Sequence, residues 1–177
     1  AMLQHNFPDR NLVVRNLGWS ADEPYLQPRP LNFGSMDEHL TDQKADIIFV
    51  CFGMNESFKG KDSLNVFKAN LDKYCKELLA HHYNGKSSPE LLLVSPIAHE
   101  NIGGHYPDPA QHNENLKAYT ASMKEVAEQN KISFIDLFTP SLKKMQPNRN
   151  DHLTVNGIHL NDKGYLLATQ WMADAMG

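Results

Sequence analysis

The sequence predicts an α/β fold, in which a parallel β-sheet lies between two layers of helices. Short apolar segments alternate along the chain with longer segments of helical periodicity, which is typical of β-α-β units. Residues 46–52 are almost entirely apolar, as expected for a parallel strand that is buried on both faces. No internal repeat, low-complexity tract or linker interrupts this pattern, so we expect a single domain over residues 1–177.

Short apolar runs mark the strands that we expect, at residues 12–14, 46–52, 91–94 and 132–135. Two longer segments between them have apolar residues three or four positions apart, which predicts amphipathic helices. The first of these helices is expected from Leu64 to Leu79, and the second from Leu116 to Ala127.

Local signals at chain reversals predict two further helices and two loops. Ser35 and Glu38 have the spacing of a capping box, which predicts a short helix that ends near Lys44. Asn161 or Asp162 is predicted to cap the last helix. Loops rich in Pro, Gly and Asn are expected at residues 97–111 and 146–150.

Composition and charge exclude several classes of protein. The 177 residues include 17 Lys and Arg against 21 Asp and Glu, a formal net charge of −4, which argues against a nucleic-acid partner. The longest apolar run, residues 47–52, is too short to span a bilayer, so we expect no membrane partner. Cys51 and Cys75 both lie in apolar patterns and are predicted to be small core residues, without a disulfide framework.

Ligands of such folds bind at the carboxyl ends of the strands, so the residues after each strand are the candidates for a site. Three blocks stand out: Asn-Leu-Gly-Trp-Ser at 16–20, Gly-Met-Asn at 53–55, and Gly-Ile-His at 157–159, followed by Leu-Asn-Asp-Lys-Gly-Tyr at 160–165. In this order they resemble the SGNH (GDSL-type) hydrolases, a family of esterases and acylhydrolases. The resemblance extends from about Phe7 to Trp171 and implies a flavodoxin-like three-layer sandwich.

The resemblance also implies catalytic roles for particular residues. Gly18 would offer its backbone N–H and Asn55 its side-chain amide to the oxyanion of an acyl-transfer reaction, where removing one such donor costs roughly 3–4 kcal/mol of transition-state stabilisation. His159 would take the proton from a serine and return it to the leaving group. Asn156 stands where most of the family has an aspartate, and its amide oxygen could still orient His159, although it cannot offset the charge of an imidazolium.

Further residues are expected near this site. Glu56, His99 and Glu100 are predicted to face it and to contribute to substrate binding. His99 also belongs, with His105 and His112, to a set of three histidines. Their spacings of six and seven residues match no compact metal-ligand motif, so we expect no metal.

The nucleophile of the family lies in a Gly-Asp-Ser block, which does not occur in residues 1–177. We therefore expect an N-terminally truncated form, in which the first strand of the family fold is missing and no serine can be named as nucleophile. The position of that missing strand, between residues 12–15 and 47–52, is expected to be filled by a strand from a second copy or by a retained N-terminal peptide, or to be closed by direct pairing of the two flanking segments. The first possibility predicts a homo-oligomer formed by strand exchange.

The leading functional hypothesis is hydrolysis of a carboxylic ester by Ser–His acyl transfer in the full-length form, without a cofactor. The expected partner is a small ester or an acetylated glycan. The alternative is a non-catalytic module, derived from the same family, that binds a glycan or an acyl ligand. A third interpretation is an unrelated flavodoxin-like ligand-binding protein. The compartment does not follow from the sequence.

Overall fold

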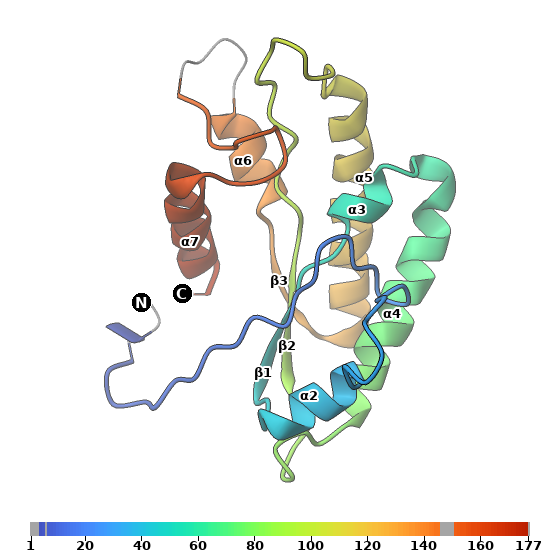
Figure 1. Ribbon diagram of the computed structural model, residues 1–177, viewed down its shortest axis with the longest axis vertical. Helices are drawn as coiled ribbons and strands as arrows, with labels where there is room; N and C mark the ends of the chain where they lie inside the picture. Colours follow the sequence, from blue (N-terminus) through green and yellow to red (C-terminus); the bar gives the residue numbers. More distant parts are fainter. Residues whose placement is uncertain (1–3, 6, 146–150, 177) are drawn as a thin grey trace.

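The protein has a three-layer α/β architecture around a small parallel sheet (Figure 1). The computed structural model describes residues 4–5, 7–145 and 151–176, so the loop predicted at residues 146–150 lies outside the described residues. The sheet has the order β1-β2-β3, with all pairs parallel. Its strands are β1 (Ile47–Val50), β2 (Glu90–Val94) and β3 (Ser133–Ile135).

The helices of the described chain are α2 (Met36–Asp42), α3 (Met54–Ser57), α4 (Leu64–Ala80), α5 (Ala110–Asn130), α6 (Phe138–Lys144) and α7 (Asp162–Met176), with a 3-10 turn, η1, at Lys61–Ser63. The predicted capping box is present, because the Glu38 N–H donates to Ser35 Oγ at 3.2 Å and the Ser35 N–H donates to Glu38 Oε2 at 2.6 Å. Asn161 caps α7, as predicted, through a 3.0 Å hydrogen bond from the Gly164 N–H to its Oδ1.

Side chains of β2 alternate between two buried clusters, one on each face of the sheet. Leu91 and Leu93 pack on the face that α4 and α5 cover. Leu92 and Val94 pack on the opposite face, together with residues of α6 and α7. The sheet is therefore the middle layer of three, with α4 and α5 on one side and α6 and α7 on the other (Figure 1).

Residues 12–14 do not form the predicted strand. Val13 and Val14 are 62% and 75% exposed, and no residue of this segment pairs with the sheet. The direct pairing with residues 47–52 that we considered is therefore also absent from the described chain. Three apolar residues carry β propensity, but without a neighbouring strand they have no hydrogen-bond partner that would order them.

Strand β1 also differs from the expectation of a strand buried on both faces. It is an edge strand, and Ile47 and Phe49 are 52% and 38% exposed. Ile48 and Val50 belong to the cluster under α4 and α5, so Ile47 and Phe49 point to the opposite face. Cys51, directly after β1, is exposed rather than part of the core, whereas Cys75 on α4 is buried as predicted.

Within the described residues, every helix is too short or too polar to cross a membrane.

Candidate active site

The turn after β1 places Asn55 at the carboxyl end of the sheet. Gly53 begins this turn with a φ of +104°, a conformation that side chains disfavour. A Cβ at this position would also lie 3.2 Å from Met123 Sδ and 3.4 Å from Pro96 Cδ. The positive φ therefore favours glycine and the space around it is tight, and α3 starts immediately, with Asn55 in its first turn.

The predicted oxyanion donors are both engaged by protein acceptors. The Asn55 side-chain amide donates to the Ala21 carbonyl at 3.3 Å and to Glu23 Oε1 at 3.1 Å, so the block that follows Gly18 lies against α3. The Gly18 N–H donates to Asn16 Oδ1 at 2.9 Å. Both donors would have to exchange these acceptors for an oxyanion before they could act in acyl transfer.

Glu23 is held in place by a cation. Lys59, just after α3, donates to both Glu23 carboxylate oxygens at 2.6 and 2.7 Å. The Glu23 carboxylate thus bridges Lys59 and the Asn55 amide. Its negative charge would repel an oxyanion that approached the same amide.

His159 and Asn156 lie in contact with each other. His159 Nδ1 lies 3.0 Å from Asn156 Oδ1, which also accepts the backbone N–H of His159 at 3.0 Å. Because an amide oxygen can only accept, this contact places the ring proton on Nδ1. The lone pair of a neutral His159 is then on Nε2, and the side chain is exposed.

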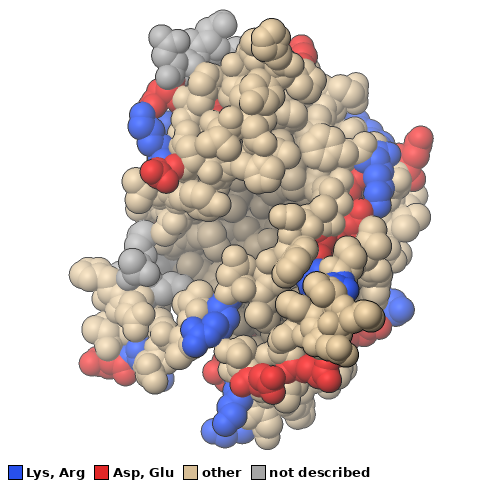
Figure 2. Space-filling model, viewed as in Figure 1, with Lys and Arg blue, Asp and Glu red and all other residues tan. Residues whose placement is uncertain are grey.

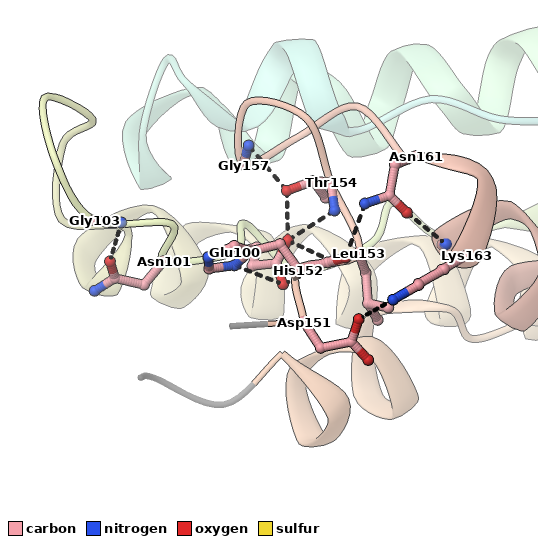
Figure 3. A network of polar contacts seen from close by, with 11 residues as sticks. Glu100, Asn101, Gly103, Asp151, His152, Leu153, Thr154, Gly157, Asn161 and Lys163 are labelled. Atoms are coloured by element: carbon pink, nitrogen blue, oxygen red, sulfur yellow. Dashed lines mark hydrogen bonds and ion pairs between the residues drawn. The ribbon is translucent and has the colours of Figure 1, made fainter. Parts of the chain in front are cut away.

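Glu100 anchors the loop that carries Asn156 and His159 (Figure 3). Its buried carboxylate accepts the Leu153 N–H at 3.0 Å, the Thr154 N–H at 2.8 Å and the Thr154 hydroxyl at 2.5 Å. The Thr154 hydroxyl oxygen accepts the Gly157 N–H at 3.0 Å, and the Glu100 N–H donates to the Gly157 carbonyl at 2.8 Å. The carboxylate that we expected to face substrate is thus directed at this loop.

The other two predicted substrate-binding residues are also buried. Glu56 Oε2 accepts the Gly53 N–H at 2.9 Å, while Oε1 has no partner among the described residues. Burial raises the pKa of the Glu56 carboxyl. His99 is 8% exposed, and burial lowers its pKa. Neither side chain presents a free polar group at the surface.

A chain of hydrogen bonds that the sequence did not indicate links His99 to α3. His99 Nδ1 lies 2.9 Å from His112 Nδ1, and His112 Nε2 lies 2.8 Å from Ser57 Oγ. Asn113 accepts the His99 N–H and donates to its carbonyl, both at 2.8 Å. The one available signal was position, since Ser57 comes two residues after Asn55.

The described residues contain no group of three or more His, Cys, Asp or Glu side chains that could hold a metal ion. The groups to which the resemblance gives a role are one exposed imidazole, oriented by an amide, the Asn55 amide on α3 and the Gly18 N–H in the segment before β1. Such a set can move a proton and stabilise negative charge on oxygen.

Comparisons with known proteins agree with the architecture. The sequence matches the GDSL-like lipase/acylhydrolase family over residues 1–167. The search among curated proteins gave no match. Among solved structures, the acetyl xylan esterase AlAXEase is similar with 18% identity and a TM-score of 0.71, over 99% of this chain and 89% of that one.

Two further structures are matched by this chain over less than two thirds of their own length. A variant of Axe2, an acetylxylan esterase from Geobacillus stearothermophilus, is similar at 18% identity with a TM-score of 0.58, over 77% of this chain and 61% of that one. A lipase/acylhydrolase from Enterococcus faecalis is similar at 20% identity with a TM-score of 0.57, over 80% of this chain and 66% of that one.

The structural similarities show a shared fold, and the family match covers nearly the whole chain. The parallel sheet lies between two helical layers, the Asn block follows β1 and the His block precedes α7, whereas the Gly block follows a segment that forms no strand. The protein belongs to the GDSL-like lipase/acylhydrolase family.

Proposed function

We propose that this domain carries the base and the oxyanion donors of a carboxylic-ester hydrolase. The observation that supports this most directly is the 3.0 Å contact between Asn156 Oδ1 and His159 Nδ1, in the block that matches the family's histidine. In this mechanism His159 Nε2 takes the proton of a serine hydroxyl as the serine attacks the ester carbonyl. His159 then returns the proton to the leaving alcohol.

Asn55 and Gly18 are the proposed oxyanion donors. To act, the Asn55 amide must exchange Glu23 for the substrate oxygen, and the Gly18 N–H must leave Asn16. Each donor would then contribute roughly 3–4 kcal/mol to transition-state stabilisation.

We propose that the nucleophilic serine is not among residues 1–177. No Gly-Asp-Ser block occurs in this sequence. Ser57, which bonds to a histidine, is fully buried and cannot meet a substrate. The occupied oxyanion donors are consistent with a site that is incomplete without further chain.

The proposed substrate is an acetyl ester on a carbohydrate. The support is the similarity in fold to two proteins described as acetyl xylan esterases. The second candidate function is a binding module without catalysis, and the bond from Asn55 to Glu23 favours it, because that carboxylate closes the oxyanion position.

Hydrolysis of p-nitrophenyl acetate distinguishes these proposals. Residues 1–177 alone are expected to stay at the background rate. The genomic DNA upstream of this coding segment is expected to encode an in-frame Gly-Asp-Ser block, and the protein expressed with it should hydrolyse the ester in a manner that His159→Ala abolishes.

Three results would count against the proposals. Turnover by residues 1–177 that depends on His159 would contradict the missing nucleophile and require a substitute serine. An extended protein without activity, or no upstream block at all, would favour the binding module. Binding of acetylated xylo-oligosaccharides by residues 1–177, measured by calorimetry, would then be its positive test.

A further inference from the structure

We infer that Ser57, His112 and His99 form a hydrogen-bonded relay that fixes the His159 loop relative to helix α3, and that His112 is its central positioning residue. The relay begins two residues after Asn55 and ends against Gly157, which lies between Asn156 and His159. Its catalytic relevance rests on the proposed function, whereas its geometry does not.

The direction of the protons in this relay follows from its first contact. Ser57 Oγ lies 2.7 Å from the Met54 carbonyl oxygen, a distance that requires the single hydroxyl proton between them. Ser57 therefore has only lone pairs for His112, and His112 Nε2 must be the donor at 2.8 Å.

The remaining protons are then determined. A neutral His112 with its proton on Nε2 has a lone pair on Nδ1, so His99 Nδ1 must donate across the 2.9 Å contact. The lone pair of His99 is left on Nε2. An added Cβ at Gly157 would lie 2.7 Å from this atom, so the imidazole ring rests directly against the loop backbone.

Both rings are kept neutral by their surroundings. Burial and the neighbouring His99 lower the pKa of His112 to about 4, and burial lowers the pKa of His99. Phe58 stacks on His112 with a centroid distance of 3.9 Å. The two rings contact Ser57 of α3, Phe58 just after it and the backbone of Gly157, and Asn113 of α5 holds the His99 backbone.

Packing alone does not account for this arrangement. An apolar pair of similar size would fill the same space without a buried and a partly buried imidazole, whose polar atoms must be satisfied. The hydrogen bonds between Ser57, His112 and His99 define the orientation of both imidazole rings, which packing alone would not do. Asn113 strengthens that orientation, because it holds the His99 backbone through both the N–H and the carbonyl.

NMR of residues 1–177 tests the relay without any need for turnover. Ring ¹⁵N shifts at pH 7 should show the proton on Nε2 of His112 and on Nδ1 of His99 and His159. His112→Phe keeps an aromatic ring against Phe58 and removes both ring nitrogens. In this variant we expect the Nδ1–H form of His159 to decrease.

Amide exchange gives a second readout in the same variant. Exchange at Gly157 should become about tenfold faster, the effect of losing one ordinary hydrogen bond. Exchange within β2 should not change. Ser57→Ala, which removes the first acceptor, should act in the same direction and serves if His112→Phe does not fold. His105→Ala, an exposed histidine in the segment before α5, is the matched control.

Unchanged His159 tautomer and unchanged Gly157 exchange in both variants would overturn the relay. Faster exchange throughout the molecule, β2 included, would also overturn it, since His112 would then be an ordinary core residue. The proposed esterase activity is tested separately, so its failure would leave these NMR outcomes as they stand.

Discussion

At the scale of single residues, the site depends on backbone groups that side chains satisfy. The Leu153 N–H, the Thr154 N–H and the Thr154 hydroxyl all donate hydrogen bonds to the buried carboxylate of Glu100. The loop with Asn156 and His159 follows directly in the sequence. A buried N–H that loses its acceptor costs roughly 1–3 kcal/mol. This loop is therefore stable only while the carboxylate is present.

Glu100→Ala should lower the free energy of unfolding by about 2–4 kcal/mol, because it leaves the Leu153 and Thr154 N–H groups without acceptors. Urea unfolding monitored by circular dichroism measures this loss. Glu114→Ala, an exposed glutamate on α5, is the control and should change stability by less than about 0.5 kcal/mol. Equal effects of the two substitutions would show that Glu100 is not an anchor.

The partly buried His112 should make stability dependent on pH. The pKa of His112 is about 4 in the folded protein, below its ordinary value of 6.5. Between these values the unfolded chain takes up a proton that the folded protein does not, so stability falls as the pH falls from about 6.5 toward 4. At pH 7 and above the cost is absent.

His112→Phe should remove part of this dependence. From pH 7 to pH 5 the wild type should lose about 1 kcal/mol more than the variant, a modest figure because the ring is only partly buried. Urea unfolding at both pH values measures the difference, and His105→Phe serves as the control. The same slope in wild type and His112→Phe would show that His112 titrates normally.

Contacts between residues close in the sequence could be predicted from the sequence, whereas contacts between distant residues could not. Asn55, Asn156 and His159 occur in short motifs whose local spacing sets their geometry, and the contact from Asn156 to His159 spans only three residues. The contact from Ser57 to His112 joins residues 55 positions apart. It depends on how the start of α5 packs against α3, which no local pattern encodes.

At the scale of elements, β propensity predicted a strand correctly only where a neighbouring strand was available for pairing. Residues 91–94 became a central strand because β1 and β3 flank them. Residues 12–14 have the same apolar character but no flanking strand, so they form no strand and leave Val13 and Val14 exposed. The cap residues of α2 and α7 were predictable because a capping contact is confined to one helical turn.

Helix α7 packs against the site loop through a glycine. A Cβ at Gly164 would lie 2.1 Å from the Leu153 carbonyl oxygen, a backbone atom that cannot easily move. Gly164→Ala should therefore displace α7 and destabilise the protein by more than about 2 kcal/mol, although alanine favours helices by about 1 kcal/mol over glycine.

Thermal unfolding measures this effect. The midpoint should fall by at least about 4 °C for a domain of this size. Gln170→Ala, on the exposed side of α7, loses only a surface contact to Asp174 and is the matched control. A Gly164→Ala midpoint equal to or above that of the control would show that α7 does not pack so closely.

At the scale of the whole molecule, the sheet is covered unevenly. Helices α4 and α5 form a continuous layer on one face, whereas the clusters of α6 and α7 reach β2 and β3 but leave Ile47 and Phe49 of β1 exposed. Figure 2 shows a hollow in the middle of the viewed face, walled mainly by uncharged residues. The outer edge of β1 has no neighbouring strand among the described residues.

An unpaired, apolar edge strand is a template for association with another chain. We expect the β1 edges of two copies of residues 1–177 to pair about a two-fold axis, which aligns them antiparallel and makes the contact self-complementary. Each Ile47–Val50 edge would gain backbone hydrogen bonds, and Ile47 and Phe49 would lose exposed apolar area. Sedimentation velocity should then show a dimer whose fraction rises with concentration.

Ile47→Lys should shift this equilibrium to the monomer, because a charged side chain on an edge strand blocks pairing, and its exposed position lets the fold tolerate the change. Leu31→Lys, a similar change at a side chain that is 96% exposed and outside the sheet, should leave the dimer intact. Amide exchange in β1 should slow with concentration in wild type and in Leu31→Lys, but not in Ile47→Lys. A wild-type protein that stays monomeric at every concentration, with its β1 amides exchanging freely, would mean that this edge is protected by its short length alone.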